Sequence, residues 1–426
     1  MSRSHFFILL SIVAALSFLG VAPAVVGNHV WSRYFINSVT SMPTHLGGEY
    51  FNIAKALVQG RGFSDPFDLG SGATAWMPPL LPALQAVCYL LVGRDVVLLS
   101  GLMVFLADLS YLAVGWICVR IMQERFGLRP SITLVIYCGY LCASFHWLFQ
   151  VTHDIWLNSL SIAGLLAFWF LRREWLPSQR GSLVWSLCWG VVSLINPLLW
   201  VLWACAHVGL LSGWPRENRR RWFTAAMIAL VFPAIWMLRI YFVLGEWHPI
   251  KSNLFFDAYI AQEMSSSGVV NTMVMSKHPL WENAFFYKSY AQKGETSFIE
   301  VYRTAFIYSL THKPWSYIYR VAMRIVAAVL LYDAFHGPYE GDTIWLNRLV
   351  HPLPFLCLLF LLYGARGSPQ RSSYLVLAAL YFAYLLPYVL FSFYGRYLWP
   401  LLSVMTLVTA CAYAEFRKRF ARKMIV

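Results

Sequence analysis

Four acidic side chains stand beside long apolar runs, where a membrane surface would leave them partly desolvated: Glu49, Asp65, Asp68 and Asp154. A carboxylate held in such a place can take a proton from a hydroxyl or an amine, so each is a candidate general base. A structural role competes with this interpretation. An acid in the first turn of a surface helix stabilises the helix dipole, and Asp154, between two apolar runs, also fits a turn or a helix N-cap.

Five basic side chains near the same predicted surface could bind a phosphate: Arg239, Lys251, Arg320, Arg324 and Arg396. A guanidinium group offers a fork of N–H donors that suits phosphate oxygens. Arg239, inside an apolar run, and Arg396, directly before Tyr397, are the strongest candidates. For each of them, extension toward lipid headgroups is the structural alternative.

The sequence lacks the common nucleotide, hydrolase and metal motifs. The glycine clusters Gly60–Gly62 and Gly70–Gly72 are not followed by the Lys-Ser/Thr pair of a phosphate-binding loop. No GxSxG, HExxH or calcium-loop motif occurs, and the eight cysteines include no CxxC pair. An enzyme of this sequence would therefore draw its activated substrate from the lipid. No cofactor is expected, with a divalent metal left open.

The composition is that of a polytopic membrane protein. Of 426 residues, 59% are hydrophobic and only 12% are charged, and the apolar residues fall in long uninterrupted runs. The formal net charge of +14 does not indicate nucleic-acid binding, because the basic residues flank apolar runs and do not line one face with interleaved aromatics. They concentrate in short connections, which the positive-inside rule assigns to the cytoplasm.

The hydropathy pattern predicts an integral multi-pass protein with about ten spans and both termini in the cytoplasm. The first run contains Ala22-Pro23-Ala24, as a cleaved signal peptide would. It continues to about Val26 and is long enough to span, so an uncleaved helix is favoured. The predicted spans are residues 6–26, 96–119, 131–150, 155–171, 182–195, 197–213, 223–244, 345–363, 373–392 and 398–414.

This topology leaves two large outer segments, residues 27–95 and 245–344, within one all-α membrane domain that covers residues 1–426. Function is expected in these segments, because the other outer connections are only a few residues long. Residues 49–59 have the apolar spacing of a short amphipathic helix, with Glu49 in its first turn.

Two further apolar stretches, residues 78–93 and 318–336, are predicted to be interfacial or re-entrant helices on the outer face. The first opens with Pro78-Pro79, and the second is interrupted by Arg320 and Arg324. If either stretch crossed the membrane alone, every later basic connection would change sides.

Several loose motifs recur along nearly the whole chain in an order that a known family shares. They are Gly48–Leu57 with Glu49-Tyr50, Gly60–Phe63, Thr74–Pro82, Asp154, Asn196-Pro197, Arg239 followed by Pro249–Asn253, Gly294-Glu295, and Arg396-Tyr397 with Pro400. In this order they resemble the GT-C glycosyltransferases, in particular the bacterial branch of the protein mannosyltransferase and aminoarabinose transferase superfamily.

The resemblance implies transfer of a sugar from a polyprenyl phosphate carrier to an acceptor on the outer face of a bacterial inner membrane. It implies that an acid of the first outer segment activates the acceptor, and Glu49 is the first choice. Relatives carry an acid a few residues before the tyrosine, where this chain has Gly47 and Gly48. A shift of one residue turns a helical side chain by about 100°, so Asp65 stays an alternative base.

By the same resemblance, Asp154 would organise the acceptor or the carrier phosphate. Arg239, Lys251 and Arg396 with Tyr397 would bind the phosphate as charge develops on it. The expected partners are a polyprenyl phosphate sugar, an unidentified lipid, glycan or protein acceptor, and membrane lipids, with no nucleic acid. The protein mannosyltransferase-like branch implies no metal.

A transporter or flippase of a lipid-linked saccharide is the main alternative, because it would need the same bundle and the same interfacial cations. Transporters tend to have paired halves with broken helices. Here most of the predicted outer residues lie in two segments of unequal length. The sequence also does not divide into two halves that resemble each other. A non-catalytic scaffold would instead tolerate neutralisation of Glu49, Asp65 and Asp154. The glycosyltransferase interpretation is favoured.

Overall fold

The computed structural model describes residues 3–25, 46–144, 148, 153–211, 218–280, 285–330, 348–364 and 366–423. Outside the described residues lie parts of both predicted outer segments (27–45, 281–284 and 331–344) and parts of the predicted spans 6–26, 131–150, 197–213 and 345–363. Where the structure describes the chain, it is all-helical, as the sequence predicts. Its β-structure is limited there to two isolated bridges, Ser64 with Ala73 and Val269 with Phe393.

Four helices of the described part are long and apolar enough to cross a membrane. They are α5 (Val96–Phe126), α10 (Arg219–Leu244), α17 (Arg371–Leu390) and the stretch Gly395–Phe420, which joins η6 (Gly395–Leu401) to α18 (Leu402–Lys423). The predicted spans that begin at residues 96, 223, 373 and 398 fall on these helices. No further helix among the described residues is identified as long and apolar enough, so a total of ten spans remains a prediction.

The shorter elements complete the bundle and its outer layer. They are α1 (Arg3–Val25), α3 (Gly48–Val58), α4 (Leu80–Leu91), α6 (Pro130–Ala143), α7 (Ile155–Leu171), α8 (Gln179–Ser193), α9 (Pro197–Leu211), α11 (Leu254–Tyr259), η4 (Ile260–Met264), α12 (Thr272–Met275), α13 (Phe285–His312), α14 (Pro314–Val329), α16 (Leu353–Leu359) and η5 (Phe360–Gly364).

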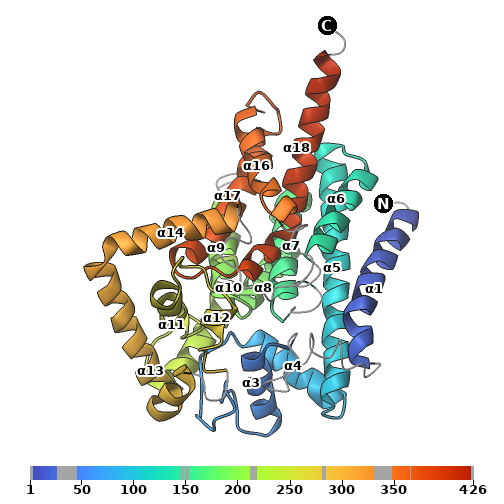
Figure 1. The fold of residues 1–426 in the computed structure, drawn as a ribbon. Helices are drawn as coiled ribbons and strands as arrows, with labels where there is room; N and C mark the ends of the chain where they lie inside the picture. Colours follow the sequence, from blue (N-terminus) through green and yellow to red (C-terminus); the bar gives the residue numbers. More distant parts are fainter. Residues whose placement is uncertain are drawn as a thin grey trace.

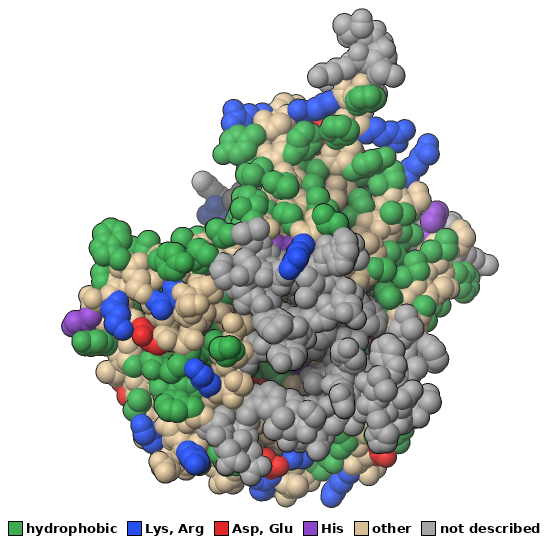
Figure 2. Space-filling model, viewed as in Figure 1, with side chains coloured by type: hydrophobic (Ala, Val, Ile, Leu, Met, Phe, Trp, Pro, Cys, Tyr) green, Lys and Arg blue, Asp and Glu red, His purple; other side chains and the backbone are tan. Residues whose placement is uncertain are grey.

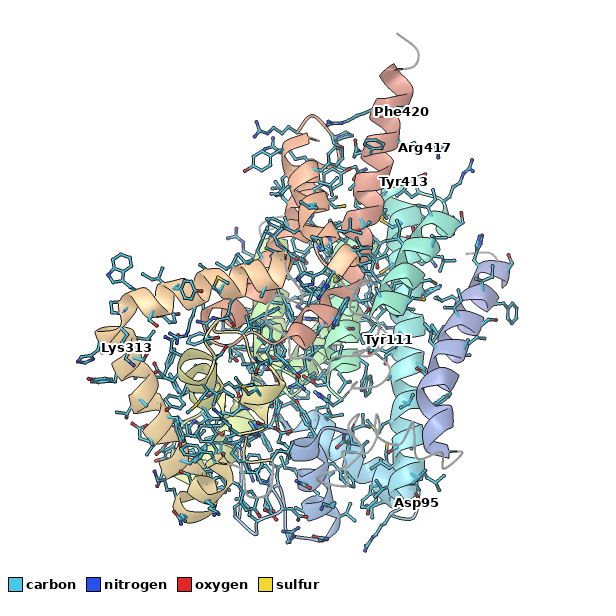
Figure 3. All side chains as sticks on the ribbon, viewed as in Figure 1. Asp95, Tyr111, Lys313, Tyr413, Arg417 and Phe420 are labelled. Carbon is cyan, nitrogen blue, oxygen red and sulfur yellow. The ribbon has the colours of Figure 1, made fainter. Side chains whose placement is uncertain are left out.

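Helix α5 runs the length of the bundle and packs against α1, α6, α7 and α18 (Figure 1). Asp95 starts it, because its Oδ1 accepts the backbone N–H groups of Val97 at 2.8 Å and Leu98 at 3.0 Å. Gly127 ends it in the left-handed conformation, with φ 64°. Asp95 therefore marks the end of the bundle that carries α3 and α4 (Figure 3).

The two outer segments form a helical layer at that end of the bundle (Figure 1). Helix α3 packs on α4, and α11 packs on α13. Helix α13 is broken at Gly294, whose φ of 71° and ψ of 172° are not helical. Lys313 stands at the corner where α13 gives way to α14, which runs crosswise to α18 (Figure 3).

Helix α14 presents an apolar face to the outside, although it is not one of the four long spanning helices. The exposed fractions are 80% for Trp315, 53% for Ile318, 56% for Tyr319 and 45% for Ile325. These positions share one side of a helix, and hydrophobic side chains gather in this part of the surface (Figure 2). The arrangement suits the interfacial helix that the sequence predicts in this region.

An aromatic cluster joins the two outer segments. Trp76 of the first segment is fully buried. Its ring centroid lies 5.6 Å from those of Tyr290 and Phe256 and 6.1 Å from that of Phe298, all in the second segment. Phe67 completes the cluster with an edge contact to Trp76 at 4.9 Å. Packed rings of this kind hold the two segments in one orientation.

The N-terminal end of α1 and the C-terminal end of α18 both lie away from α3 (Figure 1). Arg417 of α18 and Asp95 accordingly stand at opposite ends of the bundle (Figure 3). Such an arrangement is what two termini on one side of the membrane require, and the sidedness itself remains a prediction.

Candidate functional site

A cavity of about 370 Å³ lies between the outer layer and residues of α9 and α17. Its charged lining comes from α3, from the turn before α7, from the start of the second outer segment and from η6. Asp65 and Arg239 do not line it. Most of the site residues predicted from the sequence do, namely Glu49, Asp154, Lys251, Arg396 and Tyr397.

Glu49 faces a buried histidine that sequence reasoning missed. The Nε2 atom of His278 lies 3.8 Å from Glu49 Oε1, and the exposed fractions of the two side chains are 3% and 13%. His278 Nδ1 accepts the backbone N–H of Leu280 at 3.2 Å, so the neutral ring carries its proton on Nε2, toward Glu49. Burial lowers the pKa of His278, against the opposing charge of Glu49. The pair is therefore a carboxylate beside a neutral N–H donor.

Two glycines let α3 approach its neighbours closely enough to place Glu49. A Cβ atom on Gly48 would lie 2.4 Å from Leu280 Cδ1, and one on Gly47 would lie 3.1 Å from His153 Cβ. Gly47 also has a φ of 71°, which favours glycine. Gly47 and Gly48, which stand where the resembled family carries an acid, therefore have a structural reason here. They were also the signal in the sequence from which this close packing could have been predicted.

Asp154 holds Arg396 through His153. Arg396 Nη1 donates to His153 Nε2, so His153 carries its proton on Nδ1 and donates it to Asp154 Oδ1 at 2.7 Å. Asn158 Nδ2 donates to the other oxygen of Asp154 at 3.0 Å. Although burial opposes the shift, the hydrogen bond from His153 and the charge of Arg396 hold the pKa of Asp154 well below its usual range. Asp154 is thus ionised, and it holds His153 in the orientation that binds Arg396.

The guanidinium of Arg396 also lies between two tyrosine rings. Its Cζ atom is 5.4 Å from the ring centroid of Tyr394 and 5.5 Å from that of Tyr397. The ring of Tyr397 stacks in turn on Tyr388, with centroids 4.4 Å apart. Aromatic faces and the His153 contact fix the guanidinium in place, so the cavity contains a cation whose position is set before any ligand arrives.

Lys251 and Asp257 bring a second cation and a third acid to the cavity. In the part of the chain that the structure describes, neither side chain has a hydrogen bond or an ion-pair partner. Ser252, next to Lys251, is fixed because its N–H donates to Ala75 O at 2.8 Å. Sequence reasoning missed Asp257, although its place six residues after Lys251 in an outer segment was a usable signal.

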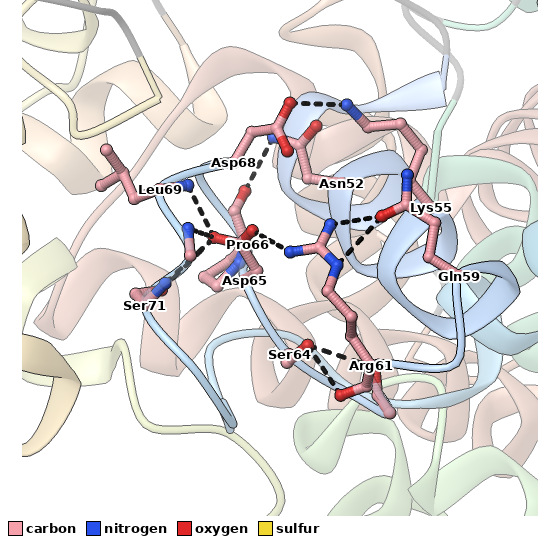
Figure 4. Close-up of polar contacts among 12 residues, drawn as sticks. Asn52, Lys55, Gln59, Arg61, Ser64, Asp65, Pro66, Asp68, Leu69 and Ser71 are labelled. Carbon is pink, nitrogen blue, oxygen red and sulfur yellow. Dashed lines mark hydrogen bonds and ion pairs between the residues drawn. The ribbon is translucent and has the colours of Figure 1, made fainter.

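Asp65 organises its own loop (Figure 4) and does not line the cavity. Its Oδ1 accepts the backbone N–H groups of Leu69 at 2.7 Å and Gly70 at 2.9 Å, and Arg61 Nη1 lies 2.6 Å from Oδ2. Burial raises the pKa of Asp65, but the bonds from Arg61 and the backbone outweigh this and lower it. Asp68 lies on the same loop and pairs with Lys55 at 2.7 Å.

The guanidinium of Arg239 also makes its hydrogen bonds within the protein. Its Nη1 donates to Thr74 O at 2.5 Å and its Nη2 to Phe63 O at 2.7 Å, so the fork expected for phosphate holds two backbone carbonyls of the first outer segment. Arg320 donates to Ser265 O at 3.1 Å, and Arg324 donates to Phe391 O. None of these three arginines lines the cavity.

Glu295 gathers donors from both outer segments. Ala75 N and Ser252 Oγ each donate to its Oε1 at 2.8 Å. Thr74 Oγ1 and Tyr290 OH donate to its Oε2, the latter at 3.1 Å. The sequence showed Glu295 only as part of a motif, because the donors lie far apart along the chain. The bonds fix the cavity wall next to Lys251.

Among the described residues, no group of three or more histidine, cysteine, aspartate or glutamate side chains could hold a metal ion. What the cavity offers chemically is a carboxylate beside a neutral histidine, two further carboxyl groups and two cations. Comparisons with models of protein families, with curated proteins and with solved structures found no match.

Proposed function

We propose that this protein is a membrane glycosyltransferase that moves a sugar from a polyprenyl phosphate carrier to an acceptor on the outer face. The observation that supports this most is the meeting of Glu49, Lys251 and Arg396 around one cavity. A carboxylate and two cations are what such a reaction needs, because one group must accept a proton while the others stabilise a leaving phosphate.

The cations would bind the carrier phosphate. Arg396 is held by His153 and the flanking tyrosines, so it can meet phosphate oxygens without first being ordered. Lys251 adds a charge with no competing partner among the described residues. Fixed donors at a developing negative charge contribute on the order of 3 kcal/mol each in a water-poor site.

Glu49 would act as the base. As the acceptor oxygen attacks the anomeric carbon, its proton passes to Glu49, and the bond between that carbon and the phosphate oxygen breaks. The bonding electrons stay on the phosphate, so the carrier leaves as a phosphate monoester. The N–H of His278, 3.8 Å from Glu49, would orient the carboxylate.

The rest of the cavity suits a lipid-linked sugar. Its volume of about 370 Å³ falls in the ordinary range for small-molecule sites. Leu198 and Val201 of α9 and Phe391 after α17 add apolar lining, which a prenyl chain could contact. Because α17 is long and apolar enough to span a membrane, such a chain could remain in the bilayer while its phosphate enters the cavity.

The proposal is tested with purified protein and a panel of polyprenyl phosphate sugars. Glu49→Gln should lower the transfer rate about a hundredfold or more while the protein stays folded, because general bases typically contribute at least that much. Asp65→Asn is the matched control: it removes an acid of the same segment that lies outside the cavity, so its rate per folded molecule should stay near that of wild type.

Other outcomes point elsewhere. Unchanged transfer in Glu49→Gln would remove Glu49 as the base. Movement of labelled lipid across liposomes without sugar transfer would favour a transporter. Binding of none of the carriers would leave the scaffold interpretation.

A further inference from the structure

Helix α11 directs one carboxyl group into the cavity. Asn253, Leu254, Asp257 and Ile260 all line it, and this spacing puts them on one side of the helix. The other side is held in place by Phe256, which is fully buried among aromatic rings of α13. The direction of the Asp257 side chain is therefore set by packing.

Charged groups from three elements surround Asp257. Lys251 precedes α11, Glu49 belongs to α3, and Arg396 with Tyr397 belongs to η6; all of them line the same cavity, as does His278. The ionised Asp154, before α7, also lines it and lies behind Arg396 through His153. An ionised Asp257 would act as counter-charge to the two cations. A phosphate between these cations would then meet a carboxylate of like charge, which is unfavourable unless that carboxyl is neutral.

We propose that Asp257 is the acid of this site, which in its neutral form hydrogen-bonds the carrier phosphate between Lys251 and Arg396 and gives its proton to the phosphate as it leaves. This inference rests on the proposed function and adds to it a residue outside the sequence-based set of candidates.

The electrostatics of the cavity support this role. Burial raises the pKa of Asp257 to about 6, the charge of Lys251 opposes this shift, and the charge of Glu49 adds to it. A group with this pKa is partly protonated near neutral pH, and a bound phosphate would raise the pKa further. Donor binding therefore takes up a proton when the pH lies above about 6.

The proton balance of one turnover follows. The acceptor hydroxyl loses its proton to Glu49, the bond from the anomeric carbon to the phosphate oxygen breaks, and its electron pair stays on that oxygen. Asp257 passes its proton to the phosphate and becomes a carboxylate. The phosphate monoester then leaves, because it faces the ionised Asp257. Glu49 returns its proton to the solvent, and Asp257 regains a proton when the next donor binds.

The first test measures affinity for the methyl diester of a short-chain prenyl phosphate, a probe whose single charge does not titrate between about pH 5 and pH 8. If only the neutral Asp257 admits the phosphate, wild-type affinity should fall about tenfold from pH 5 to pH 7, as the neutral fraction of a group with a pKa near 6 falls to about one tenth. Asp257→Asn, whose amide stays neutral, should bind equally at both pH values and about as tightly as wild type at pH 5.

The wild-type profile is informative even if the variant does not fold. Affinity that is the same at both pH values, or an Asp257→Asn variant with the wild-type profile, would overturn the assignment of Asp257 alone. Absence of diester binding at every pH would instead overturn the proposed function. The two failures are thus distinguishable.

The second test separates binding from proton transfer. Asp257→Asn should keep or lower KM at pH 7 and lower kcat about a hundredfold, because asparagine binds the phosphate but cannot release a proton to it. The matched control is Asp68→Asn, which neutralises an acid that is 48% exposed and lies outside the cavity. A kcat as high in Asp257→Asn as in Asp68→Asn would rule out the acid.

Discussion

The backbone N–H of Ala75 donates a 2.8 Å hydrogen bond to Glu295 Oε1, so the first outer segment is bound directly to a carboxylate of the second. Ser252 Oγ donates to the same oxygen at 2.8 Å. The cavity residues Met77 and Lys251 each lie within two positions of one of these donors. The geometry of the cavity wall therefore depends on a carboxylate that does not itself line the cavity.

Replacement of Glu295 by glutamine should destabilise the protein. The amide keeps one acceptor oxygen but presents an NH2 group to donors that are themselves buried, which should cost about 2 to 3 kcal/mol. Denaturant unfolding in detergent measures this. Glu300→Gln, on the same helix and 54% exposed, should change stability by less than about 0.5 kcal/mol. Equal losses of unfolding free energy in the two variants would show that the hydrogen bonds of Glu295 do not stabilise the protein.

Replacement of Arg396 by lysine should weaken binding of a polyprenyl phosphate at least tenfold, or about 1.4 kcal/mol. Lysine lacks the planar fork that meets His153 while leaving further N–H groups for a phosphate. Competition binding measures the change. Arg320→Lys serves as the control, because Arg320 lies outside the cavity and donates to Ser265 O. Wild-type affinity in Arg396→Lys would exclude bidentate recognition.

Two substitutions of His278 should differ in their effect on kcat. Leucine removes the N–H that lies 3.8 Å from Glu49, so kcat should fall about tenfold, whereas glutamine retains a side-chain N–H and should recover part of the loss. Steady-state kinetics on folded protein resolves this. Equal rates for the two variants would mean that His278 acts only by filling space.

The contribution of Asp65 to stability should depend on pH. Its pKa is lowered in the folded protein, where bonds from Arg61 and the backbone outweigh the effect of burial. Its stabilising effect is therefore fully present above the unfolded pKa of about 3.9 and is lost as the pH falls through the folded value. Asp65→Asn should be less stable than wild type at pH 6, with a difference that shrinks on acidification. A constant difference from pH 6 to about pH 3 would contradict this.

Labelling should reveal the sidedness of the chain. A cysteine at Arg303, which is 51% exposed on α13, should react with a membrane-impermeant maleimide added to intact cells. A cysteine at Arg173, exposed between α7 and α8, should react only after permeabilisation. The unmodified protein controls for its own cysteines. The reverse pattern would place the cavity in the cytoplasm and overturn the proposed function.

The sequence predicted the helical class, the four long apolar helices and most of the charged residues that line the cavity. These successes have a common cause, because hydropathy and local spacing reflect what each segment does on its own. Glu49 is an example: its place in the first turn of α3 follows from the period of Tyr50, Ile53 and Ala54.

What the sequence did not show is which partners the individual side chains contact. Arg239 was expected at a phosphate, but it holds Phe63 O, 176 positions away. Asp65 was an alternative base, yet its carboxylate holds a tight loop, which spacing alone does not reveal. His278 and Asp257 were missed because neither lies in a motif. Only the fold brings His278 beside Glu49 and places Asp257 on the same cavity as Lys251.

The cavity draws on widely separated parts of the chain, from Glu49 near its beginning to Arg396 near its end. A chain still emerging from the ribosome can insert α5 into the membrane but lacks the guanidinium that His153 is positioned to receive. On the proposed function, a partly synthesised copy therefore cannot consume lipid-linked sugar. Activity begins only after η6 has been translated and has docked against α7.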